Sequence, residues 1–315
     1  MGTRLLVDEV LSGSHQAAAR AISLIEDGAP EGQAVLRSLH ARTGRGYTVG
    51  ITGPPGAGKS TLADALIRDW RGHGHRVAVV AVDPTSPFSG GAILGDRIRM
   101  QDHASDPGVF IRSMATRGSL GGLAPATSDV AKLLDAIGYE FILIETVGTG
   151  QAEIDVVGAA DTVVIVLVSG LGDTVQTMKA GIMEIGDVFA VNKADRGDAD
   201  RTAAEVKMML GLNPQPGGWH PPVIRSVATT GEGVAEVAGA VADHRRYLEQ
   251  HRLLERRRRD RRRAEILHLV ELKARGRALE AVARSGRLDE LADQVYAGTI
   301  DPYTAADEIL RAAPP

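Results

Sequence analysis

Residues 53–61 read GPPGAGKST and connect the apolar stretch YTVGIT (47–52) to LADALIRDW (62–70), which has the spacing of a helix. Gly53, Gly58, Lys59 and Ser60 match the pattern of a phosphate-binding loop, in which glycines let successive backbone N–H groups point at phosphates. The helix that follows adds the partial positive charge of its N-terminus. The stretch therefore predicts a P-loop between a strand and a helix, and the alternative of a chance match in a glycine-rich turn is disfavoured.

Three residues of this loop have expected contacts with the nucleotide or the metal. Lys59 would reach the β- and γ-phosphates, Ser60 would ligate Mg²⁺, and Thr61 would lie near the α-phosphate. The nucleotide-binding residues predicted from this stretch are Gly53, Pro54, Pro55, Gly56, Ala57, Gly58, Lys59, Ser60 and Thr61.

A second motif, VFAVNKAD (188–195), indicates which base is bound. It places Asn192, Lys193 and Asp195 at the end of a predicted strand, where open parallel sheets build their sites. An Asp195 carboxylate can accept the N1–H and N2 amino hydrogens of guanine, whereas adenine offers no such pair of donors. The Lys193 stem can lie along the base, and Asn192 can join neighbouring loops. The motif therefore favours guanine over adenine.

A later predicted strand ends in SVATTGEG (226–233). Guanine-binding proteins often have a Ser-Ala pair here, with a backbone N–H directed at guanine O6. In this chain Val227 and Ala228 take that place, so the hydroxyl is missing or displaced to Ser226. We expect the backbone contact at Ala228 to be kept.

Carboxylates are also expected near Mg²⁺, because one serine hydroxyl cannot offset the charge of the phosphates. Asp83 and Glu145 each follow a predicted strand, and Asp96 lies in the glycine-rich stretch after Asp83. Gly148 could offer its N–H to the γ-phosphate, and Gln151 could orient water. The alternative for the three carboxylates is a helix cap or a solvated side chain.

Seven short runs rich in Val and Ile predict buried strands, and helical segments separate them. Such runs are typical of a parallel sheet covered by helices on both faces. We predict an α/β fold of the P-loop NTPase type, with two short helices in residues 4–42 and a helical C-terminal tail. The expected parts are an N-terminal helical arm (1–46), a G domain (47–233) and a C-terminal helical dimerisation region (234–315). The seven runs are YTVGIT, RVAVVAVD, VFIRSM, FILIET, TVVIVLVS, VFAVNK and PVIRSVA.

Composition points to a cytoplasmic protein without a membrane or nucleic-acid partner. The chain has 315 residues, a net charge of −4 and no cysteine, which excludes disulfides and thiolate metal sites. Its longest apolar run, VVIVLV (163–168), is too short to span a bilayer. The stretch ERRRRDRRRAE (255–265) has seven arginines in positions 256–263, but consecutive helical residues spread around the whole circumference. We therefore interpret it as a solvated face or a dimer arm.

The motifs GPPGAGKST, VDPTSPFSGGAILGDRIRM (82–100), RGSLGGLA (117–124), ETVGTGQAE (145–153) and NKAD occur in the order seen in MeaB/ArgK-type GTPases of the SIMIBI class. The chain resembles this family over nearly its whole length. The resemblance implies a slow GTPase that assists an adenosylcobalamin-dependent acyl-CoA mutase, typically methylmalonyl-CoA mutase, by gating cofactor loading and protecting the mutase. It also implies a homodimer joined through the C-terminal helices. It assigns Mg²⁺ to Ser60, Asp83, Asp96 and Glu145.

Two other functions remain open from the residues. A nickel metallochaperone GTPase is one, although the chain lacks cysteines and a histidine-rich tract. A kinase that phosphorylates a transport protein is the other. No arginine finger is fixed by the sequence, and the arginines that could act in cis are Arg97, Arg99, Arg112 and Arg117.

Overall fold

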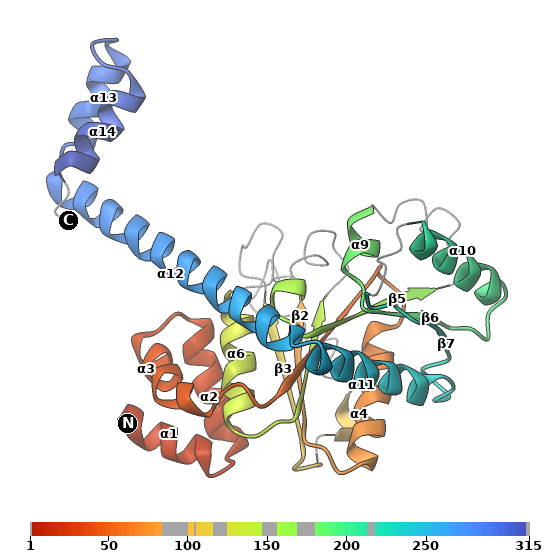
Figure 1. The fold of residues 1–315 in the computed structure, drawn as a ribbon. Coiled ribbons are helices and arrows are strands. Elements are labelled where there is room, and N and C mark those ends of the chain that lie inside the picture. The colour runs from red at the N-terminus through yellow and green to blue at the C-terminus, as the bar shows by residue number, and fades with distance from the viewer. Residues whose placement is uncertain are drawn as a thin grey trace. The chain divides into compact units, whose positions relative to one another are not determined.

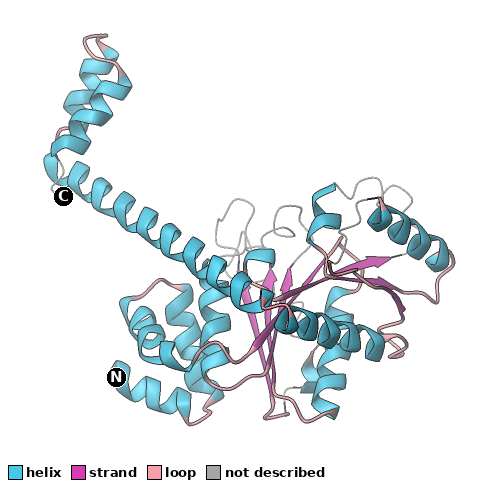
Figure 2. Cartoon of the chain, viewed as in Figure 1, coloured by secondary structure: helices cyan, strands magenta, loops and turns pink. Residues whose placement is uncertain are grey.

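A computed structural model describes residues 2–83, 100–103, 105–115, 125–146, 156–168, 180–212 and 218–312. A seven-stranded sheet carries the fold, in the order β3-β2-β4-β1-β5-β6-β7, and every pair of neighbouring strands is parallel (Figures 1 and 2). All seven predicted strands are confirmed. They are β1 (Tyr47–Thr52), β2 (Val77–Asp83), β3 (Val109–Ala115), β4 (Phe141–Thr146), β5 (Thr162–Val168), β6 (Val188–Asn192) and β7 (Val223–Ser226).

Helices cover both faces of this sheet, as the apolar strands require. Successive residues of a strand point to opposite faces, and in β2 Val77 and Val79 join one buried cluster while Ala78 and Val80 join the other. The cluster of Val77 includes side chains of α4 (Lys59–Gly72) and α11 (Val234–Gln250). The opposite cluster includes α6 (Pro125–Ala136) and α10 (Ala199–Gly211). The shorter helices of this part are α9 (Ala180–Ile185) and the 3₁₀ turns His40–Arg42, Gln101–His103 and Val156–Gly158.

The N-terminal arm contains three α-helices, so the prediction of two was wrong. They are α1 (Thr3–Leu11), α2 (His15–Glu26) and α3 (Pro30–Leu39). Gly13 has φ 88°, a left-handed conformation that ends α1, and the Ser14 side chain caps α2 by accepting from the Ala17 N–H. The arm packs on the sheet through contacts of α2 with β3 and α6.

The chain divides into two compact units, Met1–Leu254 and Glu255–Pro315. The first includes both the N-terminal arm and α11, which contacts α4. The domain boundaries at 46 and 233 stay predictions. The second is helical, as predicted for the tail, and consists of most of α12 (Leu253–Ser285), α13 (Leu288–Tyr296) and α14 (Pro302–Ala312).

The arginine-rich stretch forms part of α12. Within it Arg262 pairs with Glu265 at 3.3 Å, which fits a solvated helix face. No helix in the described ranges has the length and apolar content needed to cross a membrane.

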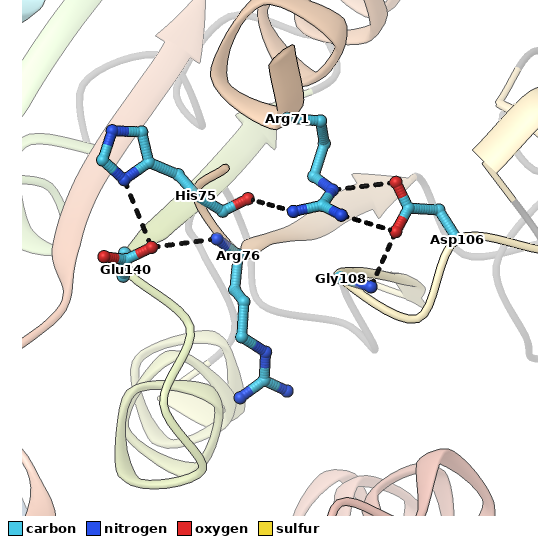
Figure 3. A network of polar contacts seen from close by, with 6 residues as sticks. All are labelled: Arg71, His75, Arg76, Asp106, Gly108 and Glu140. Carbon is cyan, nitrogen blue, oxygen red and sulfur yellow. Dashed lines mark hydrogen bonds and ion pairs between the residues drawn. The ribbon is translucent and has the colours of Figure 1, made fainter. Parts of the chain in front are cut away.

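A polar network fixes the edge of the sheet at which the strands begin (Figure 3). Arg71 of α4 makes two hydrogen bonds to Asp106, at 2.8 and 2.9 Å, and a third to the His75 carbonyl. Glu140 accepts from the Arg76 N–H at 3.0 Å. Asp106 precedes β3, Arg76 precedes β2 and Glu140 precedes β4. The network therefore joins the chain segments that enter three adjacent strands.

Candidate functional site

The predicted P-loop connects β1 to α4 at the carboxyl edge of the sheet. Its backbone needs glycine at two places. Gly53 has φ 138°, and a Cβ there would lie 2.1 Å from the Val166 carbonyl oxygen. Gly58 has φ 91°, and its Cβ would lie 2.3 Å from Asn192 Nδ2. Both values of φ lie in the region that favours glycine, so no other residue would give the same close approach.

Lys59, the first residue of α4, folds back over this loop. Its Nζ donates to the Gly53 carbonyl at 2.8 Å and to the Pro54 carbonyl at 3.0 Å. Only 7% of Lys59 is exposed, so the ammonium is held at the loop rather than in solvent. A buried cation beside glycine N–H groups makes this loop a site for an anion.

Ser60 and Glu145 come together beneath the loop. The Ser60 hydroxyl donates to Glu145 Oε1 at 2.5 Å, and both residues are buried, at 6% and 4% exposed. Glu145 belongs to β4, which lies directly beside β1. Hydroxyl and carboxylate oxygens are the ligands that Mg²⁺ prefers, so this pair fits a magnesium ion. Within the described ranges, no group of three or more histidine and carboxylate side chains is placed to hold a metal.

The remaining residues predicted for the metal and the γ-phosphate are only partly described. Asp83 ends β2, and its neighbour Val82 pairs with Thr146 of β4. The backbones of Asp83 and Glu145 therefore reach the same edge of the sheet on adjacent strands. Asp96, Gly148 and Gln151 lie outside the described residues, and their predicted roles stay predictions.

Asn192 links three parts of the site, as the sequence predicts for a residue that joins loops. Its Nδ2 donates to the Ala57 carbonyl of the P-loop at 2.9 Å. Its Oδ1 accepts from the Ala228 N–H at 3.1 Å and from the Ser226 hydroxyl at 3.4 Å. The side chain is 2% exposed. One buried amide thus holds the P-loop against the loop that follows β7.

The other two residues of the base motif differ in exposure. Lys193 has φ 58° and its Nζ donates to the Gly56 carbonyl at 2.8 Å, so its stem runs from the end of β6 to the P-loop. Asp195 lies in the turn after β6 and is exposed. An exposed carboxylate beside a lysine stem is accessible to a planar base.

The loop after β7 gives the Ala228 N–H a partner within the protein. The Ala228 N–H, expected to face guanine O6, donates to Asn192. Ser226, to which the hydroxyl expected at Val227 could be displaced, is fully buried and also faces Asn192. The Val227 N–H pairs with the Glu232 carbonyl at 2.9 Å and closes the loop. A base contact through Ala228 would therefore have to share its N–H with Asn192.

Two buried threonines were missed by sequence reasoning. Thr146 Oγ1 donates to Thr52 Oγ1 at 2.8 Å, and both side chains are fully buried. Thr52 directly precedes the P-loop and Thr146 directly follows Glu145, so the pair ties β1 to β4 where the two functional connections begin. A signal was present, because a hydroxyl residue ends both apolar runs, YTVGIT and FILIET.

Arg112, one of the four arginines that could act in cis, is held elsewhere. In β3 its guanidinium binds Glu26 and donates to the Ser23 hydroxyl at 3.1 Å, both on α2. It therefore ties the N-terminal arm to the sheet, and its use as an arginine finger was a wrong expectation. The other three, Arg97, Arg99 and Arg117, lie outside the described residues.

Comparison with known proteins gives a consistent result. The family model of the methylmalonyl-CoA mutase-associated GTPase MeaB matches residues 18–283. A protein of Pyrococcus abyssi, described as a candidate GTPase, is 51% identical over 97% of this chain and 95% of its own length. The mitochondrial methylmalonic aciduria type A homolog of Caenorhabditis elegans is 33% identical over 97% of this chain and 82% of its own length.

Among solved structures, a LAO/AO transport system kinase has a TM-score of 0.72 and 24% identity, over 98% of this chain and 96% of that one. At this identity the similarity establishes the fold, which is that of the P-loop proteins. The sequence matches go further, because the family model covers the P-loop, the buried Ser60–Glu145 pair and the Asn192 linkage. The chain belongs to the MeaB family and is a guanine-nucleotide-binding GTPase.

Proposed function

We propose that this GTPase uses Mg²⁺-dependent hydrolysis of GTP as a switch that gates adenosylcobalamin loading of an acyl-CoA mutase and protects that mutase. Methylmalonyl-CoA mutase is the proposed partner. The observation that supports this is the family match over residues 18–283, whose description names that mutase. The relative named as a methylmalonic aciduria type A homolog is consistent with it.

The residues of the site divide the work of hydrolysis. Lys59 holds its ammonium over the P-loop, where it would stabilise negative charge on the β- and γ-phosphates. Ser60 and Glu145 would hold Mg²⁺, with Asp83 and Asp96 as further carboxylates. When bound, the ion neutralises charge on the phosphate oxygens. We propose that Gly148 senses the γ-phosphate through its N–H and that Gln151 orients water.

Recognition of guanine is assigned to the residues after β6. Asp195 would accept two hydrogen bonds from the base, and Lys193 would cover one face of it. Asn192 would act indirectly, because its amide is used to hold the P-loop and the loop after β7. Thr61, at the first turn of α4, would lie near the α-phosphate.

Replacement of Asp195 by Asn tests the base assignment. The amide can donate to the C2 carbonyl of xanthine but cannot accept both guanine hydrogens. Loss of two hydrogen bonds to a charged group corresponds to a fall in GTP affinity of about 100-fold or more, and xanthine nucleotides should bind better than to the wild type. Asp198→Asn, the same chemical change at another exposed position of the connection, is the control. Unchanged GTP affinity in Asp195→Asn would contradict the assignment.

The switch function is tested with a partner present. The chain is incubated with an acyl-CoA mutase that copurifies with it, and transfer of adenosylcobalamin is followed with GTP, with GDP and with neither. The Lys59→Ala variant, which should bind GTP poorly, separates an effect of the bound nucleotide from other effects of adding it. Equal transfer under all three conditions would refute gating.

Using nucleotide labelled at the γ-phosphate in this incubation distinguishes a kinase. A kinase would place the label on a protein, whereas a GTPase releases it as free phosphate. The pairing of two copies through the C-terminal helices and the cytoplasmic location stay predictions of the family resemblance and of the composition.

A further inference from the structure

The described residues 100–103 and 105–108 are held on the P-loop helix α4 at two points. At the first, His103 Nε2 lies 2.9 Å from Asp64 Oδ1. At the second, Arg71 makes its two hydrogen bonds to Asp106, at 2.8 and 2.9 Å. Asp64 and Arg71 are two helical turns apart and so lie on one side of α4. Between β2 and β3, this is therefore a segment with a fixed position on the helix.

The first fastening is buried. Asp64 is 6% exposed and His103 is 8% exposed. Met100, three residues before His103, is 1% exposed and belongs to the core cluster that contains α4. An ionised carboxylate only accepts hydrogen bonds, so the imidazole donates through Nε2–H. Arg68 also pairs with Asp64, but its side chain is 55% exposed. In a buried place such a carboxylate requires well-placed donors, and His103 is the one that comes from outside the helix.

The position of this pair connects it to the site. Asp64 lies one turn after Ser60 on α4. His103 is on the segment that begins at Met100, four residues after Asp96 in the chain. The pair therefore lies close in the chain to one proposed magnesium ligand on each side. Neither His103 nor Asp64 is itself a proposed ligand of nucleotide or metal.

We propose that His103 and Asp64 are positioning residues for GTP hydrolysis, whose contact holds the Met100–His103 turn on the helix that carries Ser60. Packed interiors transmit small displacements, so loosening this contact would disturb the first turns of α4 and with them the 2.5 Å contact between the Ser60 hydroxyl and Glu145. The proposal rests on the Mg²⁺-dependent hydrolysis proposed above.

The second fastening supplies a contrast within the same segment. Arg71 and Asp106 are near the amino edge of the sheet, where the strands begin (Figure 3). Breaking the Arg71–Asp106 pair should lower the free energy of unfolding. It should leave the Mg²⁺ concentration at half-maximal rate unchanged, because the pair lies at the opposite edge of the sheet from the P-loop.

Two amide substitutions at position 103 test the proposal. Glutamine carries its amide nitrogen as far from Cβ as histidine carries Nε2, so His103→Gln can still donate to Asp64. Asparagine is one methylene shorter, so His103→Asn cannot reach. Both are uncharged amides, which makes them a matched pair. Arg71→Ala is the control for a general loss of stability.

The measurements are kcat for GTP hydrolysis, the Mg²⁺ concentration at half-maximal rate, the melting temperature, and GDP affinity in EDTA. In His103→Asn the half-maximal Mg²⁺ concentration should rise about tenfold, equivalent to ~1.4 kcal/mol, with a fall in kcat and unchanged GDP affinity in EDTA. His103→Gln should recover most of the change. Arg71→Ala should lower the melting temperature and leave the magnesium curve in place.

Three results would overturn the proposal. They are equal magnesium curves for His103→Asn and wild type, a shift in Arg71→Ala as large as that in His103→Asn, and a failure of His103→Gln to recover. If His103→Asn does not fold, His103→Gln against Arg71→Ala decides by the same curves, since only a shift confined to position 103 fits. Wild type without any Mg²⁺ dependence would contradict the metal role and this proposal together, whereas a normal wild-type curve with an unaffected His103→Asn contradicts this proposal alone.

Discussion

Gly58 and Gly56 form a natural pair for testing how the P-loop is held. Both are in the left-handed region, with φ 91° and 75°. A Cβ on Gly56 would meet nothing within 4 Å, whereas a Cβ on Gly58 would lie 2.3 Å from Asn192 Nδ2. Substitution by alanine therefore costs the same backbone strain at both positions, and a side-chain collision at Gly58 only.

The size of each effect follows from the contacts. Placing alanine in the left-handed region costs about 1–2 kcal/mol, which is the whole expected effect for Gly56→Ala. In Gly58→Ala the Asn192 amide has to move away. That breaks its hydrogen bond to the Ala57 carbonyl, and the buried polar groups then left unpaired cost about 1–3 kcal/mol. Together with the backbone strain, the free energy of unfolding should therefore fall by about 2–5 kcal/mol in Gly58→Ala.

Urea unfolding without nucleotide measures both changes, because no ligand then contributes to stability. In a Gly58→Ala background, the further change Asn192→Ala should cost less than it does in wild type, since it removes the collision. Equal losses for Gly56→Ala and Gly58→Ala, or an Asn192→Ala cost that is the same in both backgrounds, would refute the reasoning.

Two further predictions concern residues outside the P-loop. Hydrogen bonding from Arg71 holds the pKa of Asp106 below its usual value, so its contribution to stability is complete above about pH 4 and is lost as pH falls through the lowered pKa. Acid unfolding curves should therefore fall less steeply in Arg71→Ala, and parallel curves would contradict the pairing. For the Thr52–Thr146 pair, Thr146→Val leaves the Thr52 hydroxyl without this partner and should destabilise by about 1–3 kcal/mol. Thr52→Val should cost less, because the Thr146 hydroxyl can still donate to the Ile51 carbonyl, 3.5 Å away. The double variant should cost less than the sum, because no hydroxyl is then left unpaired. Unfolding measurements on the four proteins of this cycle test it, and strict additivity would contradict it.

The parts of the fold that could be predicted from sequence are those written in short-range patterns. Each of the seven strands is a run of a few apolar residues, and the P-loop is a fixed spacing of glycine, lysine and serine. The linking role of Asn192 followed from its place at a strand end, because parallel strands bring their carboxyl ends to one edge. These predictions needed no knowledge of which distant residues meet.

The features that could not be predicted depend on contacts between residues that are distant in sequence. Arg112 was considered for catalysis because nothing near it in the chain shows that Glu26 is its partner. The hydrogen bond from the Ala228 N–H to Asn192 could not be predicted, because the two residues are distant in sequence. The third helix of the arm is a different case. The prediction of two helices rested on the Gly-Ala-Pro break at residues 28–30, and the weaker break at Gly13 and Ser14 was not used.

The two edges of the sheet have different roles, because all strands are parallel and end at the same edge. The residues proposed to bind the nucleotide and Mg²⁺ come from connections that leave β1, β2, β4, β6 and β7, all at the carboxyl edge. At the amino edge, Tyr47 and Thr162 begin β1 and β5, and their hydroxyls lie 2.6 Å apart. Thr162 in turn contacts His244 of α11 at 2.8 Å. These side chains are buried and hydrogen-bonded to one another, so they can fix the sheet without contacting the nucleotide. Because each strand separates its two ends by its full length, substitutions at the amino edge should change stability and leave guanine-nucleotide affinity as it is.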